Sequence, residues 1–255
     1  MLKAIRVDVR RILSTGRLMF FVLLVAVIIP IVMEILYIAV GKSLGGPYVA
    51  TIDDFSSFTA YSTIYLAVFT SFFLYGEFGD GTIRNKIISG KSRLQILFSY
   101  CIVNSLVAIV IQVVSAVSAL LVDLVFRVEI GVEFTELLYF IAVSSLAEVA
   151  ITVLYTSIII CFCTNKAGVA IPAAIALFMK IALLVITDAL YTDSGIPKVT
   201  GAKLSGYTFF DRYISFSHLT GPLRWDIGSY LIGSIALIII SVIVGSVVFS
   251  KKNLK

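Results

Sequence analysis

The chain has 255 residues, of which 60% are hydrophobic and only 14% are charged, and its mean hydropathy is +1.07. A soluble domain carries about 25% charged residues, so this composition excludes an ordinary soluble protein. Apolar runs of about 20 residues, long enough to cross the hydrocarbon core of a bilayer, recur along the sequence. We therefore expect an all-α polytopic membrane protein, because backbone groups in lipid must be paired within helices.

The first segment, residues 1–17, reads "MLKAIRVDVRRILSTGR" and predicts an amphipathic helix lying on the membrane. The apolar residues that share one helical face are Leu2, Ile5, Val9, Ile12 and Leu13, and the basic residues beside or opposite them are Lys3, Arg6, Arg10 and Arg11. The alternative is an ordinary basic flank that anchors the first span. The segment is not a cleavable signal, because the following apolar run is too long and lacks a cleavage site.

Six membrane spans are expected within a single permease-like domain, residues 1–255. They are residues 18–40, 55–75, 94–126, 137–163, 167–187 and 227–249. The longest connection, residues 188–226, is interpreted as an outer loop that contains short interfacial helices.

Positive charge predicts the orientation of these spans. With six spans, the loops and tails on the N-terminal side hold 13 of the 20 Lys and Arg residues. Both termini and the insert at residues 77–93 are therefore expected in the cytoplasm. The net charge of +5 is then topological and gives no evidence of nucleic-acid binding.

The insert "EFGDGTIRNKIISGKSR", residues 77–93, is the one strongly polar stretch between apolar spans. Asp80 is a candidate cap for a helix that begins near Gly81, and Gly90 suits the end of that helix. Ile83 and Ile87 share one face of it, with Arg84 and Lys86 off that face. About two turns of helix cannot span a membrane, so the segment predicts a short knob across the ends of the second and third spans.

Three interpretations of the insert compete. It is a positive loop that happens to be helical, a phosphate-binding loop, or a docking knob for a separate cytoplasmic protein with Ile83 and Ile87 as its anchors. The phosphate-binding interpretation fails on spacing, because a Walker A motif requires Gly where Asn85 stands. No nucleotide site is evident anywhere in the chain.

The insert resembles the cytoplasmic coupling segment of ABC-2-type transporter permeases, with its acidic residue, its G-T-[IL]-R run and its G-x-[SR]-R run. The basic N-terminal helix, six spans and long outer loop extend the resemblance over the whole chain. The resemblance implies an export permease without catalytic residues or a cofactor of its own, paired with a second permease copy and with separate ATPases that bind ATP and Mg. It also implies docking residues, which are Gly81, Thr82, Ile83, Arg84, Lys86, Ile87, Gly90 and Arg93.

Ionisable residues inside the spans are candidates for function because they are costly in lipid. Glu34, Glu148 and Lys180 are expected at a similar depth in the outer half, where Glu148 and Lys180 lie on consecutive antiparallel spans. They are interpreted either as a structural ion pair that fixes helix register or as a polar patch on a translocation path. Cys101, Cys161 and Cys163 are interpreted as packing residues rather than metal ligands, and the lone His218 is given no catalytic role.

The resulting hypothesis is an exporter subunit in a bacterial plasma membrane, surrounded by lipid. Its expected substrates are amphipathic or hydrophobic, most plausibly cationic peptides, with lipid-like drugs or lipid-linked glycans as the alternative. The rival functions are a proton-coupled secondary transporter, a membrane-bound enzyme, and a membrane anchor or immunity protein. An internal repeat would favour the first rival, and none is evident between the two halves.

Overall fold

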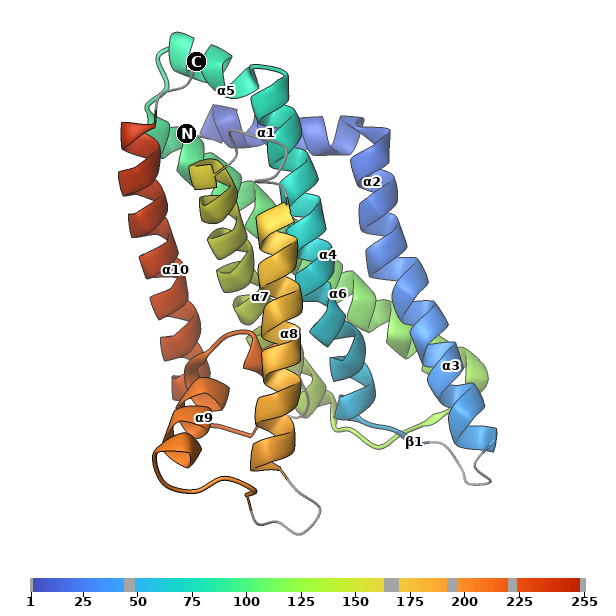
Figure 1. The fold of residues 1–255 in the computed structure, drawn as a ribbon. Coiled ribbons are helices and arrows are strands. Elements are labelled where there is room, and N and C mark those ends of the chain that lie inside the picture. The colour runs from blue at the N-terminus through green and yellow to red at the C-terminus, as the bar shows by residue number, and fades with distance from the viewer. Residues whose placement is uncertain (1, 44–48, 163–169, 192–196, 220–223, 253–255) are drawn as a thin grey trace.

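The computed structural model describes residues 2–43, 49–162, 170–191, 197–219 and 224–252, and these are almost entirely helical (Figure 1). The α-helices are α1 Leu2–Ser14, α2 Gly16–Leu23, α3 Ile29–Ser43, α4 Ile52–Gly79, α5 Thr82–Ile88, α6 Arg93–Phe126, α7 Phe134–Phe162, α8 Ala170–Leu190, α9 Gly201–Tyr213 and α10 Ile227–Lys251. Two short turns, the π-helical η1 Leu24–Ile28 and the 3₁₀-helical η3 Ser217–Leu219, complete them. Strands β1 Val49–Ala50 and β2 Glu129–Ile130 form a short parallel pair.

The long helices run between two ends of a bundle (Figure 1). One end, the basic end, carries α1, α5 and the last turn of α10. The other, the α9 end, carries α9, η3 and the two strands. The N-terminal helix and the end of α10 therefore lie on the same side of the molecule.

Within the described parts of the chain, five helical segments are long and apolar enough to cross a membrane: Gly16–Gly41, Arg93–Phe126, Phe134–Phe162, Ala170–Leu190 and Ile227–Lys251. They coincide with five of the six expected spans. The remaining one, residues 55–75, lies in α4, which packs against α7 and α8. Ten of its 21 residues are Ser, Thr or Tyr, and these lower its hydropathy relative to the other helices. Among the residues that the structure describes, five helices are thus long and apolar enough to span a membrane, and the count of six stays a prediction.

The first spanning segment widens into the π-helical turn η1 just before Pro30. Proline has no backbone N–H, so Pro30 cannot donate to the carbonyl of Ala26 four residues earlier, and its ring crowds that carbonyl. The hydroxyl of Ser118 on α6 lies 3.4 Å from the carbonyl oxygen of Ala26, although its shorter bond, 2.8 Å, goes to Val114 of its own helix. A neighbouring helix thereby places a polar group beside a carbonyl that the proline leaves without its usual donor.

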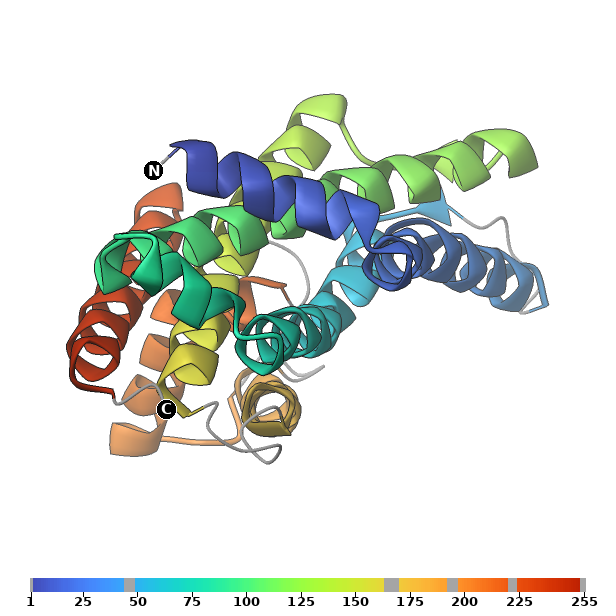
Figure 2. The ribbon, with the colours of Figure 1, turned by 90° about the horizontal axis from the view of Figure 1, so that it is seen from above.

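The predicted N-terminal helix forms, and Figure 2 shows α1 lying flat across the basic end along α6. Ile5, Val9 and Ile12 pack into a hydrophobic cluster that draws on α4, α5, α6, α7 and α10. Leu13, expected on the same face, is instead exposed, because only part of that face meets the bundle. The helix is therefore built into the core at the basic end.

At the α9 end, the expected outer loop, residues 188–226, folds as α9 followed by η3 in its described parts. Helix α9 packs against α8 and α10. Its last residue approaches α10 so closely that a Cβ on Gly233 would lie 2.0 Å from the carbonyl oxygen of Tyr213. Gly233 therefore permits this contact, since any larger residue would separate α9 from α10.

Candidate functional site

The turns on either side of α5 are specified locally by the sequence. Gly81 has φ of +66° and Gly90 has φ of +84°, a left-handed conformation that costs glycine no steric strain. Gly90 ends α5 as predicted, and the N–H of Lys91 bonds to the carbonyl of Lys86. Ser92 then caps α6 in a capping box with Gln95. The sequence Gly90-Lys91-Ser92 therefore ends helix α5 and begins helix α6.

Asp80 does not cap α5, contrary to the prediction. Residue 81, in the left-handed conformation, is the N-cap and no side chain caps the helix. The Asp80 carboxylate turns toward α1, where Nη2 of Arg11 donates to it at 2.5 Å. Tertiary ion pairing has therefore replaced the local cap.

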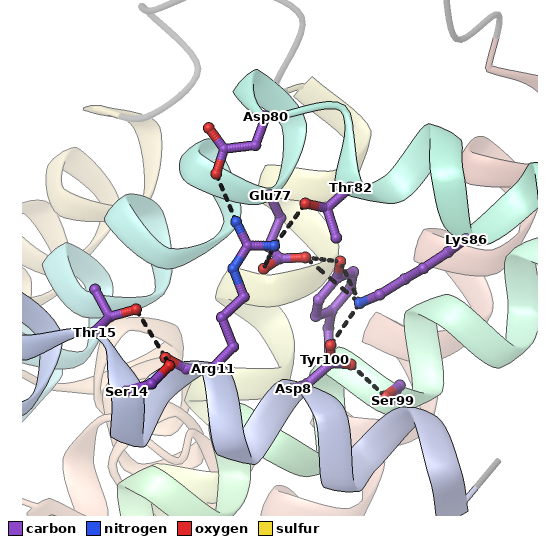
Figure 3. Close-up of polar contacts among 10 residues, drawn as sticks. All are labelled: Asp8, Arg11, Ser14, Thr15, Glu77, Asp80, Thr82, Lys86, Ser99 and Tyr100. Atoms are coloured by element: carbon purple, nitrogen blue, oxygen red, sulfur yellow. Dashed lines mark hydrogen bonds and ion pairs between the residues drawn. The ribbon is translucent and has the colours of Figure 1, made fainter.

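Arg11 of α1 connects three groups at the junction of α4 and α5 (Figure 3). Besides Asp80, its Nη1 donates to the hydroxyl of Thr82 at 2.6 Å and lies 2.8 Å from Oε1 of Glu77 as an ion pair. The Glu77 carboxylate is 1% exposed, so this guanidinium neutralises a charge that water does not reach. Arg11, expected beside the apolar face at headgroup level, thus faces the protein.

Lys86 of α5 lies beside Arg11 in the same network (Figure 3). Its Nζ lies 2.6 Å from Oδ1 of Asp8, 2.9 Å from the hydroxyl of Tyr100 and 3.5 Å from Oε2 of Glu77. The Tyr100 hydroxyl donates to Glu77 at 2.6 Å, and Ser99 donates to Asp8 at 2.8 Å. We call these residues, with Arg11, Asp80 and Thr82, the ionic network.

The ionic network joins four helices, α1, α4, α5 and α6, through three carboxylates and two cations. Burying such charges brings little net stability, because desolvation offsets their attraction. Removing one partner, however, costs about 3–5 kcal/mol because the other charge is left buried and unpaired. The network therefore fixes how α5 sits on the bundle, and displacing α5 would displace α1 and α4 with it.

The faces of α5 differ from the predicted ones. Ile83 is 2% exposed within the basic-end cluster, and Ile87 packs half-buried against it. Lys86 is also buried. The residues that face outward are Arg84, Asn85 and Ile88, the last with 74% of its surface exposed. The prediction of Ile83 as an exposed anchor and of Lys86 as an outward orienting charge is therefore wrong, because Ile83 packs in the core and Lys86 pairs with buried carboxylates.

Arg93, also expected to face a partner, closes helix α10. Its Nη1 donates to the carbonyls of Phe249, Ser250 and Lys252 at 2.6 to 2.9 Å. Lys252 in turn donates to the carbonyl of Ile160 at 2.7 Å, near the end of α7. Cations at helix C-termini satisfy free carbonyls and complement the helix dipole. Some of the basic residues at the basic end therefore cap the C-termini of helices α7 and α10.

The expected pair of Glu148 and Lys180 does not form. Glu148 of α7 is fully buried, and the neighbouring group on α4 is the Ser62 hydroxyl. Lys180 of α8 places its Nζ 4.3 Å from the centre of the Tyr61 ring, a cation–π contact. Because α4 packs against both α7 and α8, its consecutive residues Tyr61 and Ser62 take up the two charged side chains separately.

Glu34 belongs to another part of the bundle. It is 1% exposed on α3, and α3 packs mainly against η1 and α6. Glu148 and Lys180 lie on α7 and α8 instead. The three residues expected to form one polar patch are therefore distributed over separate helix interfaces.

The α9 end holds a second polar cluster, centred on the buried Asp211. Its Oδ2 accepts hydrogen bonds from the Tyr191 hydroxyl at 2.5 Å and from the Trp225 indole at 2.9 Å. Burial, together with the bond to Asp211, raises the pKa of Tyr191 to about 12. Arg224 stacks over the Tyr191 ring at 3.7 Å. We call Asp211, Tyr191, Trp225 and Arg224 the aromatic cluster, in which the acid accepts from neutral donors and the Arg224 cation lies over a ring.

His218 of η3 lies beside the aromatic cluster. Its ring packs edge-on against Tyr230, with centroids 4.5 Å apart, and Nε2 lies 3.1 Å from the carbonyl oxygen of Arg212. Burial lowers the pKa of His218 to about 4, although that hydrogen bond and the nearby Asp211 act in the opposite direction. His218 is therefore neutral at physiological pH and serves packing.

Sequence reasoning missed the residues that carry the ionic network from outside the insert, Asp8, Ser99 and Tyr100. One signal was present: Asp8 is the only acidic residue among residues 1–17, whose other charged residues are all basic. Nothing local pointed to Tyr100, which reads as an ordinary apolar position of a span. Its role depends on helix packing.

The described acidic, histidine and cysteine residues are candidates for metal ligands, and the sequence can be compared with known families. Within the described ranges, no three His, Cys, Asp or Glu residues gather as metal ligands would. Cys101 is buried and Cys161 half-buried, while Cys163 lies outside the described residues. No protein-family model and no curated protein matches this sequence.

Proposed function

We propose that the chain is the membrane subunit of an ATP-driven exporter and that α5 receives movement from a separate ATPase. The observation that carries the proposal is the ionic network. A seven-residue helix that protrudes at one end of a bundle has no structural need for ties to three other helices. Such ties are suited to transmitting a push on α5 to the long helices.

The exposed face of α5 is the proposed docking surface. Ile88 provides an apolar anchor and Arg84 an orienting charge, in place of the buried Ile83 and Lys86. Both termini and α5 would then lie in the cytoplasm, as the distribution of Lys and Arg favours. The permease would act as two copies with two ATPases, because one α5 offers one docking surface.

The proposed substrate is an amphipathic or hydrophobic molecule, of which peptides, lipid-like drugs and lipid-linked glycans are examples. Support comes from the apolar surfaces of the long helices. The separation of Glu34, Glu148 and Lys180 removes the argument for a cationic substrate that rested on their shared depth.

A proton-coupled secondary transporter is the second candidate, and Glu148 favours it. A carboxyl group that is fully buried in a helix bundle, with no ion pair to any described residue, is typical of a protonation site. Proton-driven uptake into vesicles without ATP, abolished by Glu148→Gln, would establish this alternative.

The test of the exporter is purification of the tagged chain from its native membranes, followed by identification of any co-purifying ATPase. Ile88→Asp should abolish co-purification, because a charge would have to be desolvated in an apolar groove. Phe209→Asp, at a similarly exposed apolar residue of the α9 end, should leave it unchanged. Purification of the wild type without any ATPase, or equal yields from both variants, would contradict the proposal.

A further inference from the structure

A pocket of about 520 Å³ lies between the α1–α2 corner and α4, beside the ionic network. Its apolar part is a set of phenylalanines, Phe21 of α2 and Phe69, Phe72 and Phe73 of α4. Phe69 stacks between Phe21 and Phe73 with ring centroids 6.2 to 6.3 Å apart, so this surface is preformed. The volume falls in the usual range for small-molecule sites, about 300–1,000 Å³.

The pocket has a polar mouth and an apolar interior. The mouth, at the level of α1, is lined by Arg11, Arg17, Glu77 and Asp80. Phe72 lies seven residues, or about 10 Å along the helix, further from the basic end than the last residue of α4. This order of polar and apolar groups follows that of a lipid, with a headgroup at the interface and a chain directed into the bilayer.

The charge at the mouth distinguishes between headgroups. Arg11 forms ion pairs with both Glu77 and Asp80, and Lys86 adds a second cation beside Glu77. Arg17 is exposed, and its guanidinium makes no ion pair or hydrogen bond with any residue that the structure describes. Among the described residues at the mouth, Arg17 is therefore the cation that no carboxylate pairs with, and it attracts an anion and repels a cationic group. A small soluble anion would leave the phenylalanine surface unused.

We propose that this pocket binds one anionic phospholipid from the leaflet at the basic end, with its phosphate on Arg17 and an acyl chain on Phe21, Phe69 and Phe72. The site does not depend on the exporter hypothesis. It would, however, place a lipid against Glu77 and Arg11, which also belong to the ionic network. Occupancy then stabilises the arrangement of α1, α2 and α4.

The first test uses native mass spectrometry of the full chain, purified after reconstitution with equal amounts of phosphatidylglycerol and phosphatidylcholine. The wild type should retain one phosphatidylglycerol in preference to phosphatidylcholine. Arg17→Gln should lower that retention about tenfold. Arg10→Gln, which removes an exposed cation of α1 outside the pocket, should leave it unchanged. Equal losses in both variants, or no preference in the wild type, would overturn the proposal, since general surface charge would then explain binding.

The second test fills the pocket. Gly76 lines it, and a Cβ at Gly76 would meet no atom within 4 Å, so Gly76→Leu can enter the cavity without a clash. Gly79→Leu is the matched control, because Gly79 lies one turn further along α4, is equally unobstructed and does not line the pocket. Only Gly76→Leu should lose the bound lipid, with both variants retaining wild-type helicity by circular dichroism. Retention of the lipid by Gly76→Leu would refute the assignment.

Discussion

The two ends of the bundle solve the same problem with different chemistry. At the basic end, the ionic network holds a short helix by opposite charges, of which Asp8, Glu77 and Lys86 are buried. At the α9 end, the buried contact is one acid with neutral donors, Tyr191 and Trp225, while the ion pair of Arg212 with Asp226 is largely exposed. Paired charges lose heavily when one partner is removed, whereas an acceptor with neutral donors tolerates exchange. The basic end therefore fixes the position of α5 strictly, whereas the α9 end holds α9 against the bundle with contacts that tolerate substitution.

Among the substitutions considered, loss of Lys86 should lower the free energy of unfolding the most. Lys86→Met removes the cation beside Asp8 and Glu77, so we expect the free energy of unfolding to fall by about 3–5 kcal/mol. Denaturant titration in detergent, followed by circular dichroism, measures this change. Lys198→Met is the control, because the Lys198–Asp188 pair is exposed and is expected to contribute less than about 1 kcal/mol.

The double variant Asp8→Asn with Lys86→Met separates charge from packing. With one carboxylate removed along with the cation, part of the lost stability should return. A double variant as unstable as the sum of the single variants would show that the residues act independently, and would contradict a coupled network.

The α9 end should respond to pH through His218. The pKa of His218 in the folded state is about 4, below the ordinary 6.5, so the unfolded chain binds this proton more tightly. Its contribution to stability is complete above pH 6.5 and is lost as the pH falls toward 4. The difference corresponds to at most about 3 kcal/mol. Unfolding between pH 4 and 7, followed by the fluorescence of Trp225, the only tryptophan, measures it.

His218→Phe is the control for this titration. It keeps an aromatic ring against Tyr230 and removes the ionisable group. Its free energy of unfolding should vary less with pH between 4 and 7 than that of the wild type. A pH profile equal to that of the wild type would assign the effect to another group.

Exchanges at Asp211 test how tolerant the aromatic cluster is. Asp211→Asn keeps an acceptor for the Tyr191 hydroxyl or the Trp225 indole, so we expect a loss of about 1 kcal/mol. Asp211→Ala leaves both donors unpaired and should cost about 2 kcal/mol or more, with a shift of Trp225 fluorescence. If Asp211→Asn were as damaging as Lys86→Met, the two ends would not differ as proposed.

The sequence predicted the boundaries within the insert better than its orientation. Gly90 acts locally, so the end of α5 could be predicted from its neighbouring residues alone. The inward direction of Lys86 depends on Asp8, 78 residues away, and on Tyr100 of another helix. Glu148 and Lys180 are likewise kept apart because α4 lies against both of their helices. Counting residues along each span predicts depth in the membrane, but it does not predict which helices are neighbours.

Two glycines with positive φ, one at each end, should have modest effects on stability. Gly90 has φ of +84° after α5, and Gly201 has φ of +62° at the start of α9. Alanine at either position should cost about 1–2 kcal/mol, because a Cβ is strained in the left-handed conformation and neither site is otherwise crowded. Because both substitutions should lower stability by a similar amount, co-purification with an ATPase is the measurement that distinguishes them. Gly90→Ala would tilt α5 and should weaken co-purification of an ATPase, whereas Gly201→Ala should not. Equal behaviour of the two variants in co-purification, at equal stability, would indicate that the exact position of α5 is immaterial and would remove the functional contrast between the two ends.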